Sequence, residues 1–471
     1  MFLRLGGFSL PLRPVSWRSP ISWNLNGVRA RPWLGLAASL LVSFGVWHWS
    51  ESILVPANTT EALVRGVPIG NNSDLYPRWW GAREVLLHHR NPYGADVTRE
   101  IQTGFYGRPL DPSKPSDPHF QESFVYPLYV VFLLSPTLTL PFRTVQEIFR
   151  WLLLFVTGCS VPLWMNAVGF RPRPLLTITG IVLALSSYPA VLEFHQQNLA
   201  ALALFLLAAA AAATVCDWLV LSGFLLALAT IRPDVSGLVI FWFLLWSTAR
   251  WSERKRLLCS FAGTMTALVI AAEAVSPRWI TSFLAAVREY PSYGADPSVI
   301  RLFLPSFLAK LVTAALLCVL FAFCWHCRKA APGSQDFAWA LAWVSAVTIA
   351  ILPKLAGYNQ PLLIPALLVL LARRDVMWKA GLIPRVLVKV AFGCQLWQWI
   401  TATVLSLCSF LTPAARLSAA ALVPEYLVFG LSAFTVAAVI ALTFSVAGTP
   451  PELTRPLKSL HQRFATKEVV T

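Results

Sequence analysis

The sequence predicts an all-α polytopic membrane protein with about twelve membrane-spanning helices. Composition is the first observation behind this fold class: 56% of the residues are hydrophobic and only 13% are charged. Soluble domains carry about 25% charged residues, so charge is depleted by about half. The second observation is that apolar runs able to cross a bilayer recur along the whole chain.

The expected membrane domain covers residues 33–447 and is flanked by two polar ends. Residues 1–32 contain several arginines, no acidic residue and no apolar core before a cleavage site, so we expect a cytoplasmic leader rather than a signal peptide. Residues 448–471 are expected to form a cytoplasmic tail. The long polar insert 55–123 is expected to be the first extracytoplasmic loop.

The expected spans are the apolar segments of the chain. They are 33–54, 147–168, 174–192, 199–215, 218–231, 235–249, 257–275, 306–326, 337–353, 360–372, 382–409 and 424–447. The segment 124–141 is also apolar, but three prolines break it, and we expect it to be re-entrant or interfacial. With the N-terminus inside, this assignment places the basic loops between spans on the cytoplasmic side.

Charge and cysteine usage exclude several function classes. The net charge of +16 fits basic loops facing anionic lipid and does not indicate nucleic-acid binding. Cys324 and Cys327 form one C-x-x-C without the second pair that a zinc ribbon needs. No Gly-rich phosphate loop occurs. We expect no cofactor, and no ligand cluster indicates a metal.

Ionisable residues at the membrane edge are costly and therefore indicate function. With the topology above, several of them fall on the extracytoplasmic side: Asp74, Glu193, His195, Arg232, Asp234 and Lys354. Acid and base at one membrane face suit a substrate with an anionic head and a lipid tail. A polyprenyl-phosphate sugar is such a substrate.

This chemistry assigns roles to three of these side chains. Arg232 and Lys354 are the candidates for binding the donor phosphate, because a guanidinium or an ammonium pairs well with an oxyanion. The departing phosphate needs no proton donor, so a single carboxylate acting as general base on the acceptor hydroxyl suffices. We assign that role to Asp74, which predicts inversion at the sugar carbon.

Structural interpretations of the same residues stay open. Ser73 or Asp74 could cap a helix running to about residue 89. Arg232 and Lys354 could extend to lipid headgroups. Trp79 and Trp80 could be interface anchors. The loop 276–305 carries apolar residues at helical spacing and is expected to contain a helix on the outer surface.

Four motifs, in this order and spacing, resemble glycosyltransferase family 87. The first is Asp74-Leu75-Tyr76-Pro77-Arg78-Trp79-Trp80-Gly81-Ala82-Arg83, followed by Asn91-Pro92-Tyr93. The second is Phe124-Val125-Tyr126-Pro127-Leu128. The third is His195-Gln196-Gln197-Asn198, similar to a Gly-Gln-x-Asn loop, and the fourth is Ile231-Arg232-Pro233, where the family usually has Lys-Pro.

The resemblance covers roughly residues 35–375 and implies a GT-C fold. It also implies that Asp74 is the base and that the donor is a polyprenyl-phosphate sugar, usually mannose. The active site would face the periplasm or cell exterior from the plasma (inner) membrane. We expect the sugar or acceptor to be bound by Gln196, Asn198, His195 and Tyr126. The chain departs from the family at Leu128, His195 and Arg232.

The resulting prediction is a membrane hexosyltransferase, with mannose as the expected sugar, that transfers a sugar from a polyprenyl-phosphate donor to a glycolipid or envelope glycan. One alternative is a transporter or flippase of lipid-linked sugars, which would be expected to show internal repeats and discontinuous helices at mid-membrane. A catalytically inactive scaffold protein is a further alternative.

Overall fold

The computed structural model describes residues 32–64, 73–111, 113–114, 117–118, 120–290, 298–352 and 356–447. Within these ranges the protein is all-helical, as the composition predicts, with no strand. The N-terminal elements are α1 (Pro32–Trp49), the π-helix η1 (Ser50–Leu54), α2 (Val55–Val64), α3 (Leu75–His88), α4 (Ala95–Tyr106), α5 (Val130–Leu134) and the 3₁₀ helix η2 (Ser135–Thr137).

The remaining elements follow from residue 142 onward. They are α6 (Phe142–Ala167), α7 (Pro174–Leu185), α8 (Tyr188–Gln196), α9 (Ala200–Val215), α10 (Leu219–Ala229), α11 (Pro233–Thr248), α12 (Trp251–Val275), α13 (Trp279–Glu289), α14 (Val299–Phe303), α15 (Ser306–Cys327), α16 (Gln335–Ile351), η4 (Gly357–Leu363), α17 (Ile364–Lys379), α18 (Leu382–Ser409), α19 (Ala414–Leu417), η5 (Ser418–Ala420) and α20 (Val423–Ala447).

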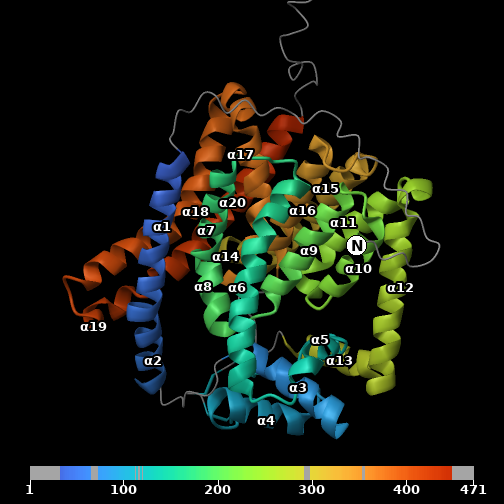
Figure 1. The fold of residues 1–471 in the computed structure, drawn as a ribbon, viewed down its shortest axis with the longest axis vertical. Helices are drawn as coiled ribbons and strands as arrows, with labels where there is room; N and C mark the ends of the chain where they lie inside the picture. Colours follow the sequence, from blue (N-terminus) through green and yellow to red (C-terminus); the bar gives the residue numbers. More distant parts are fainter. Residues whose placement is uncertain are drawn as a thin grey trace, which may run out of the picture.

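The helices form a large bundle with a smaller group of helices at one end (Figure 1). We call α3, α4, α5 and α13 the cap, and the end of the bundle beside them the cap end. One hydrophobic cluster holds the cap together, with Trp79 of α3, Ile101 of α4, Val131 of α5 and Trp279 of α13 among its buried members, and it continues into α6, α9 and α12 of the bundle.

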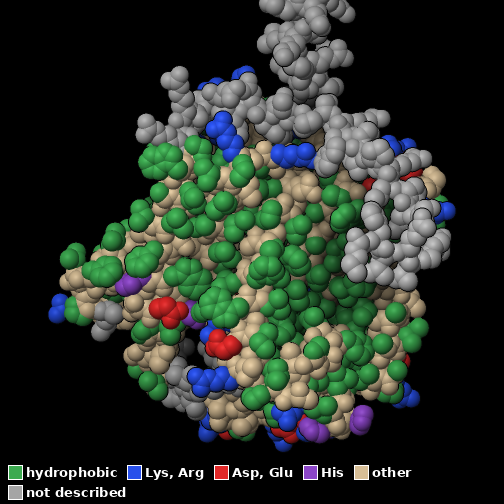
Figure 2. Space-filling view, viewed as in Figure 1, with side chains coloured by type: hydrophobic (Ala, Val, Ile, Leu, Met, Phe, Trp, Pro, Cys, Tyr) green, Lys and Arg blue, Asp and Glu red, His purple; other side chains and the backbone are tan. Residues whose placement is uncertain are grey.

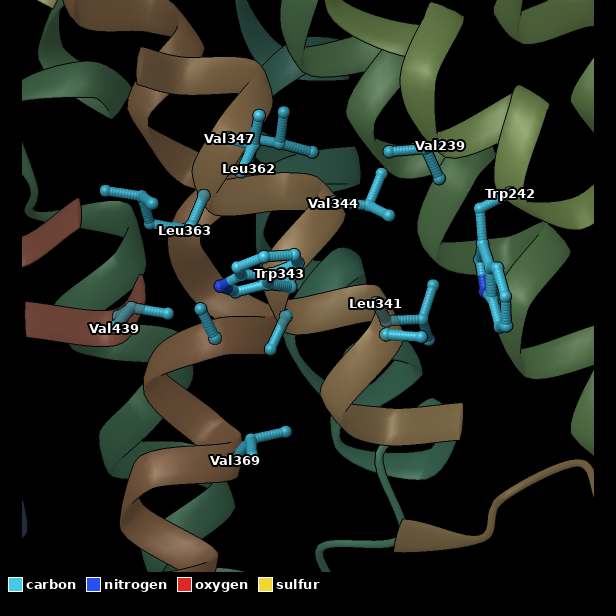
Figure 3. Packing of buried hydrophobic residues seen from close by; sticks show 14 of the residues in the cluster. Val239, Trp242, Leu341, Trp343, Val344, Val347, Leu362, Leu363, Val369 and Val439 are labelled. Atoms are coloured by element: carbon cyan, nitrogen blue, oxygen red, sulfur yellow. The ribbon is translucent and has the colours of Figure 1, made fainter. Parts of the chain in front are cut away.

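Helix α16 lies at the centre of the bundle. Every residue from Phe337 to Ala350 is buried, which fits a helix that is apolar on all sides. Trp343 packs among Val347 of the same helix, Leu362 and Leu363 of η4, and Val439 of α20 (Figure 3).

Small residues let neighbouring helices approach closely. Helix α9 is rich in alanine and packs against α6 and α10. At Gly223 on α10, an added Cβ would lie 2.2 Å from the carbonyl oxygen of Leu257 on α12. Any larger residue there would push α10 and α12 apart.

Each of the twelve predicted spans contains a helix, but their lengths differ. Five helical stretches in the described chain are long and apolar enough to cross a membrane: Phe142–Ala167, Trp251–Val275, Ser306–Cys327, Leu382–Ser409 and Ser418–Leu442. A sixth forms if α7 and α8, bent by 54° at their junction, are one broken span. Helices α9, α10, α11 and α16 are apolar but shorter.

The surface agrees with an integral membrane protein. Large apolar side chains such as Trp151, Phe155 and Ile270 are 63%, 67% and 64% exposed. Hydrophobic side chains cover the middle of the face drawn in Figure 2, and Lys and Arg gather toward its upper and lower ends.

The basic loops meet at the end of the bundle opposite the cap, which we call the basic end. The Arg254 guanidinium donates to the carbonyl oxygens of Trp246 (2.7 Å), Arg328 (3.0 Å) and Ala330 (2.8 Å). The loops after α6 and α15 and the helix α17 itself also line a small cavity there, with Gly169, Gly333 and Arg373 among the lining residues. The sequence-based topology, which puts these loops on one side, matches this arrangement.

The proline-broken segment 124–141 does not cross the bundle. It forms the short elements α5 and η2 within the cap. Helix α13, predicted as a surface helix, packs on this segment through Trp279, whose ring meets that of Tyr129 edge-on at 5.9 Å.

Candidate functional site

Asp74 stands directly before α3, but its carboxylate does not cap that helix. Its backbone is already helical (φ −59°, ψ −19°), and no side-chain capping hydrogen bond forms. The Ser73 hydroxyl accepts from the Leu75 amide instead, at 3.3 Å. The capping interpretation is therefore wrong for Asp74, and its carboxylate serves another contact.

The break between α8 and α9 meets the start of α3. Gln197 adopts a left-handed conformation (φ 50°), which ends α8 and turns the chain into α9. The Asp74 amide donates to the Gln196 carbonyl at 2.7 Å, and the Ser73 hydroxyl donates to Gln197 Oε1 at 2.7 Å. Gln146 of α6 donates to the same oxygen at 3.1 Å. The cap is thus attached to the bundle at this loop.

Asn198 connects the Asp74 carboxylate to the bundle. Its Nδ2 donates to Asp74 Oδ2 at 2.6 Å, and its Oδ1 accepts from the Ala200 amide at 2.9 Å at the start of α9. The same Oδ1 accepts from Arg232 Nη1 at 2.5 Å. Asn198 is 1% exposed, so these contacts fix its amide and, through it, one carboxylate oxygen.

Arg232 lies between α10 and α11, where Pro233 begins the next helix. Its Nε and Nη2 donate to the two oxygens of Asp234 at 3.0 and 2.9 Å, and its Nη1 also donates to Tyr126 Oη at 3.1 Å. With the bond to Asn198, four of its five N–H groups are engaged. Its side chain is 9% exposed, which argues against extension to lipid headgroups.

Arg78 is a second cation beside Asp74 that the sequence-based assignment omitted. It donates to the Asp74 carbonyl and lies over the Tyr126 ring, 4.4 Å from the centroid, while Arg232 lies 5.8 Å from the same centroid. Its buried Nε has no hydrogen-bond partner in the described chain. Burial lowers the pKa of Arg78, but Tyr126, Asp74 and Glu122 outweigh it and raise the pKa above the usual value. Its position four residues after Asp74, one helical turn along the chain, was the available signal.

The other three predicted site residues have three different outcomes. His195 turns away from Asp74 and bonds Ser50 of the π-helix η1 at 2.8 Å, with Glu51 at 3.6 Å. Gln196 contributes its carbonyl oxygen, whereas the side chain that bonds Ser73 belongs to Gln197. Lys354 lies outside the described residues.

Asp74, Asn198, Arg232, Tyr126 and Asp234 form one hydrogen-bonded chain, which we call the Asp74 network. Within the described part of the protein, no hydrogen bond reaches the second carboxylate oxygen of Asp74, and this residue is only partly buried. The network can hold a base, and its guanidiniums can bind an anion beside it.

The face drawn in Figure 2 is hollowed between the positions of α2 and α6, at the level where cap and bundle meet. Acidic, basic and histidine side chains gather at the rim. In the described residues, no group of three or more His, Cys, Asp or Glu side chains could hold a metal ion.

Comparison of the chain with protein-family models, with curated proteins and with solved structures finds no match.

Proposed function

We propose that the protein is a membrane glycosyltransferase of GT-C architecture, with its active site at the cap end on the extracytoplasmic side. It would transfer a sugar from a polyprenyl-phosphate donor to a glycolipid or envelope glycan. The observation that carries the proposal is the state of Asp74: a partly buried carboxylate at the junction of cap and bundle, with one oxygen held by Asn198 and no helix-capping role.

This arrangement suits a general base. The bond of 2.6 Å from Asn198 fixes Oδ2, and Oδ1 is left to accept the proton of an acceptor hydroxyl. The hydroxyl oxygen then attacks the sugar carbon from the side opposite the phosphate, the bond to the phosphate oxygen breaks, and the phosphate leaves with the electron pair. The configuration at the sugar carbon inverts.

The two guanidiniums beside Tyr126 suit the donor phosphate. Arg232 is already paired with Asp234 and has one N–H group left, whereas Arg78 has an Nε without a partner in the described chain. Arg78 is therefore the stronger candidate for direct contact, and Arg232 supports it by placing positive charge behind the leaving group. Lys354 remains a proposed third contact.

The test is donor consumption in proteoliposomes that contain polyprenyl-phosphate mannose and a glycan extract as acceptor. We expect Asp74→Asn to reduce turnover by about 10²-fold or more, as for a missing general base, while the protein still elutes as a folded species. Asp375→Asn is the matched control, because that side chain is 71% exposed and lies at the other end of the bundle.

Equal turnover in the wild type and Asp74→Asn would remove Asp74 from the catalytic role. If the wild type consumes no donor, a lipid-scrambling assay on the same vesicles tests the alternative of a flippase.

A further inference from the structure

The cap contains a cavity of 710 Å³ that the Asp74 network does not use. It lies between α4, the segment leading from α4 to Phe124, and α13. The volume falls within the range of about 300–1,000 Å³ that is usual for sites binding small organic ligands.

Gln102 of α4 lines this cavity and is only 6% exposed. Its Oε1 accepts from the Leu110 amide at 3.1 Å, so the orientation of the side-chain amide is fixed. Within the described chain, no group accepts a hydrogen bond from its Nε2. This amide is held in place and keeps two unused N–H groups open to solvent beside the cavity, so it can donate to a ligand that accepts hydrogen bonds.

The rest of the lining is polar and partly charged, with two aspartates, a glutamate, a lysine and an arginine beside neutral polar and aromatic side chains. Gln121, Ser282 and Arg99 line the cavity, and their side chains form no hydrogen bond with another side chain in the described residues. Tyr93 and Phe124 add aromatic surface, with their rings edge-on at 5.2 Å. Sugars present a hydroxyl on nearly every ring carbon and an apolar C–H face. Amides and hydroxyls beside aromatic rings match both properties.

The cavity and the Asp74 network share one stretch of chain. Phe124 lines the cavity, and Tyr126 contacts both Arg78 and Arg232. Tyr93 joins the two places, because its hydroxyl donates to the Tyr126 carbonyl at 2.7 Å. Two residues of extended chain span at most about 7 Å, so the wall that Phe124 forms lies within the length of a few sugar units of the network.

We propose that this cavity is a binding subsite for a glycan chain, which holds the acceptor while its terminal hydroxyl lies at Asp74. The identification as an acceptor rests on the proposed glycosyltransferase function, whereas glycan binding itself does not. The two can be tested separately.

The experiment measures binding of soluble trisaccharides of mannose, glucose or galactose to the purified full-length protein in detergent, by saturation-transfer NMR and calorimetry. We expect saturable binding by the wild type to at least one of them. Gln102→Leu should weaken that binding about five- to ten-fold through loss of the amide hydrogen bonds. Gln121→Leu should weaken it by a similar factor.

Thr103→Val is the matched control, because Thr103 is the next residue on α4, is exposed and does not line the cavity. It should bind like the wild type. Thermal unfolding of each variant in the same detergent separates lost binding from lost folding, and Gln121→Leu retains the test if Gln102→Leu fails to fold.

No saturable binding by the wild type overturns the inference, as does equal binding by the wild type and both leucine variants. Saturable glycan binding without donor turnover keeps the subsite and overturns the glycosyltransferase function. Donor turnover without trisaccharide binding keeps the glycosyltransferase function and overturns the subsite.

Discussion

Arg232 and Arg254 are both buried arginines at helix ends, with 7% and 3% exposure, at opposite ends of the bundle. Arg254 donates to three backbone carbonyls and lies over the Trp246 ring at 3.6 Å. Arg232 donates to the side chains of Asp234, Asn198 and Tyr126. The residue type and the burial are alike, but the partners differ.

The partners decide what each arginine does. Backbone carbonyls at helix C-termini lack partners within their helices, so Arg254 satisfies groups that every fold must satisfy and joins two loops in the process. The partners of Arg232 lead through Asn198 to a carboxylate with an open oxygen. An arginine bonded to carbonyls therefore stabilises the fold, and one bonded to a chain of side chains positions a reactive group.

The largest expected effect is on stability at the basic end. Arg254→Ala leaves three carbonyl oxygens without their cationic donor, and we expect the free energy of unfolding to fall by about 3–5 kcal/mol. Reversible unfolding in mixed detergent and SDS micelles measures it. Turnover per folded molecule should stay unchanged, because Arg254 lies far from the Asp74 network.

Arg250→Ala is the control for that variant. Arg250 is 44% exposed and its ion pair with Glu253 is long at 3.5 Å, so the change in unfolding free energy should stay within about 0.5 kcal/mol. If Arg254→Ala lowers the unfolding free energy by as little, the inference that Arg254 joins these loops is wrong.

The same substitution at the cap end should give the opposite pattern. Arg232→Ala removes the donor that holds Asn198 and the charge behind the proposed leaving group, and we expect turnover to fall by about 10²-fold. Arg232→Lys keeps the charge but loses the fork to Asp234, so it should recover only part of the rate. Donor consumption in proteoliposomes measures both variants.

Arg143→Lys, an exposed arginine in the first turn of α6, should turn over donor like the wild type. Full turnover by Arg232→Ala would mean that Asn198 and Asp74 keep their places without Arg232, and the comparison of the two arginines would fail.

The sequence predicts the helices of this protein and the gathering of its basic loops at one end, because both follow from local properties. Apolar runs mark the helices, prolines mark the segment 124–141 that does not cross, and basic loops mark one end. The lengths of the helices are harder to predict, because in the sequence a short apolar helix such as α10 looks like a membrane span. Whether it crosses depends on its neighbours.

The Asp74 network is predicted only in part. Asp74, Asn198, Arg232 and Tyr126 are correctly brought to one place, but the bond from Asn198 to Asp74 joins residues 124 positions apart. No local pattern distinguishes Gln197 from Gln196 as the residue whose side chain faces Ser73, or turns His195 toward η1. Those choices depend on one left-handed residue that ends α8.

The smallest expected effect is a loss of hydrogen-exchange protection at acid pH, which should differ between the cap and the basic end. In the cap, Arg90 bonds Glu84, Asp96 and Glu100, and Arg108 bonds Asp117. The hydrogen bond from Arg90 lowers the pKa of Glu100, and the hydrogen bond from Arg108 lowers the pKa of Asp117. These carboxylates therefore stabilise the cap at pH values above their unfolded pKa of about 4, and that contribution disappears as the pH falls through their lower folded values.

The contacts of Arg254 are with carbonyl oxygens, which do not titrate in this range. We therefore expect hydrogen-exchange protection in α4 to fall by up to about five-fold between pH 7 and pH 3, while protection around residues 246–256 stays constant after correction for the intrinsic exchange rate. Arg108→Gln should reduce the pH dependence near Asp117 in particular. Equal loss of protection at both ends would indicate general acid unfolding and would remove the carboxylate pairs as its cause.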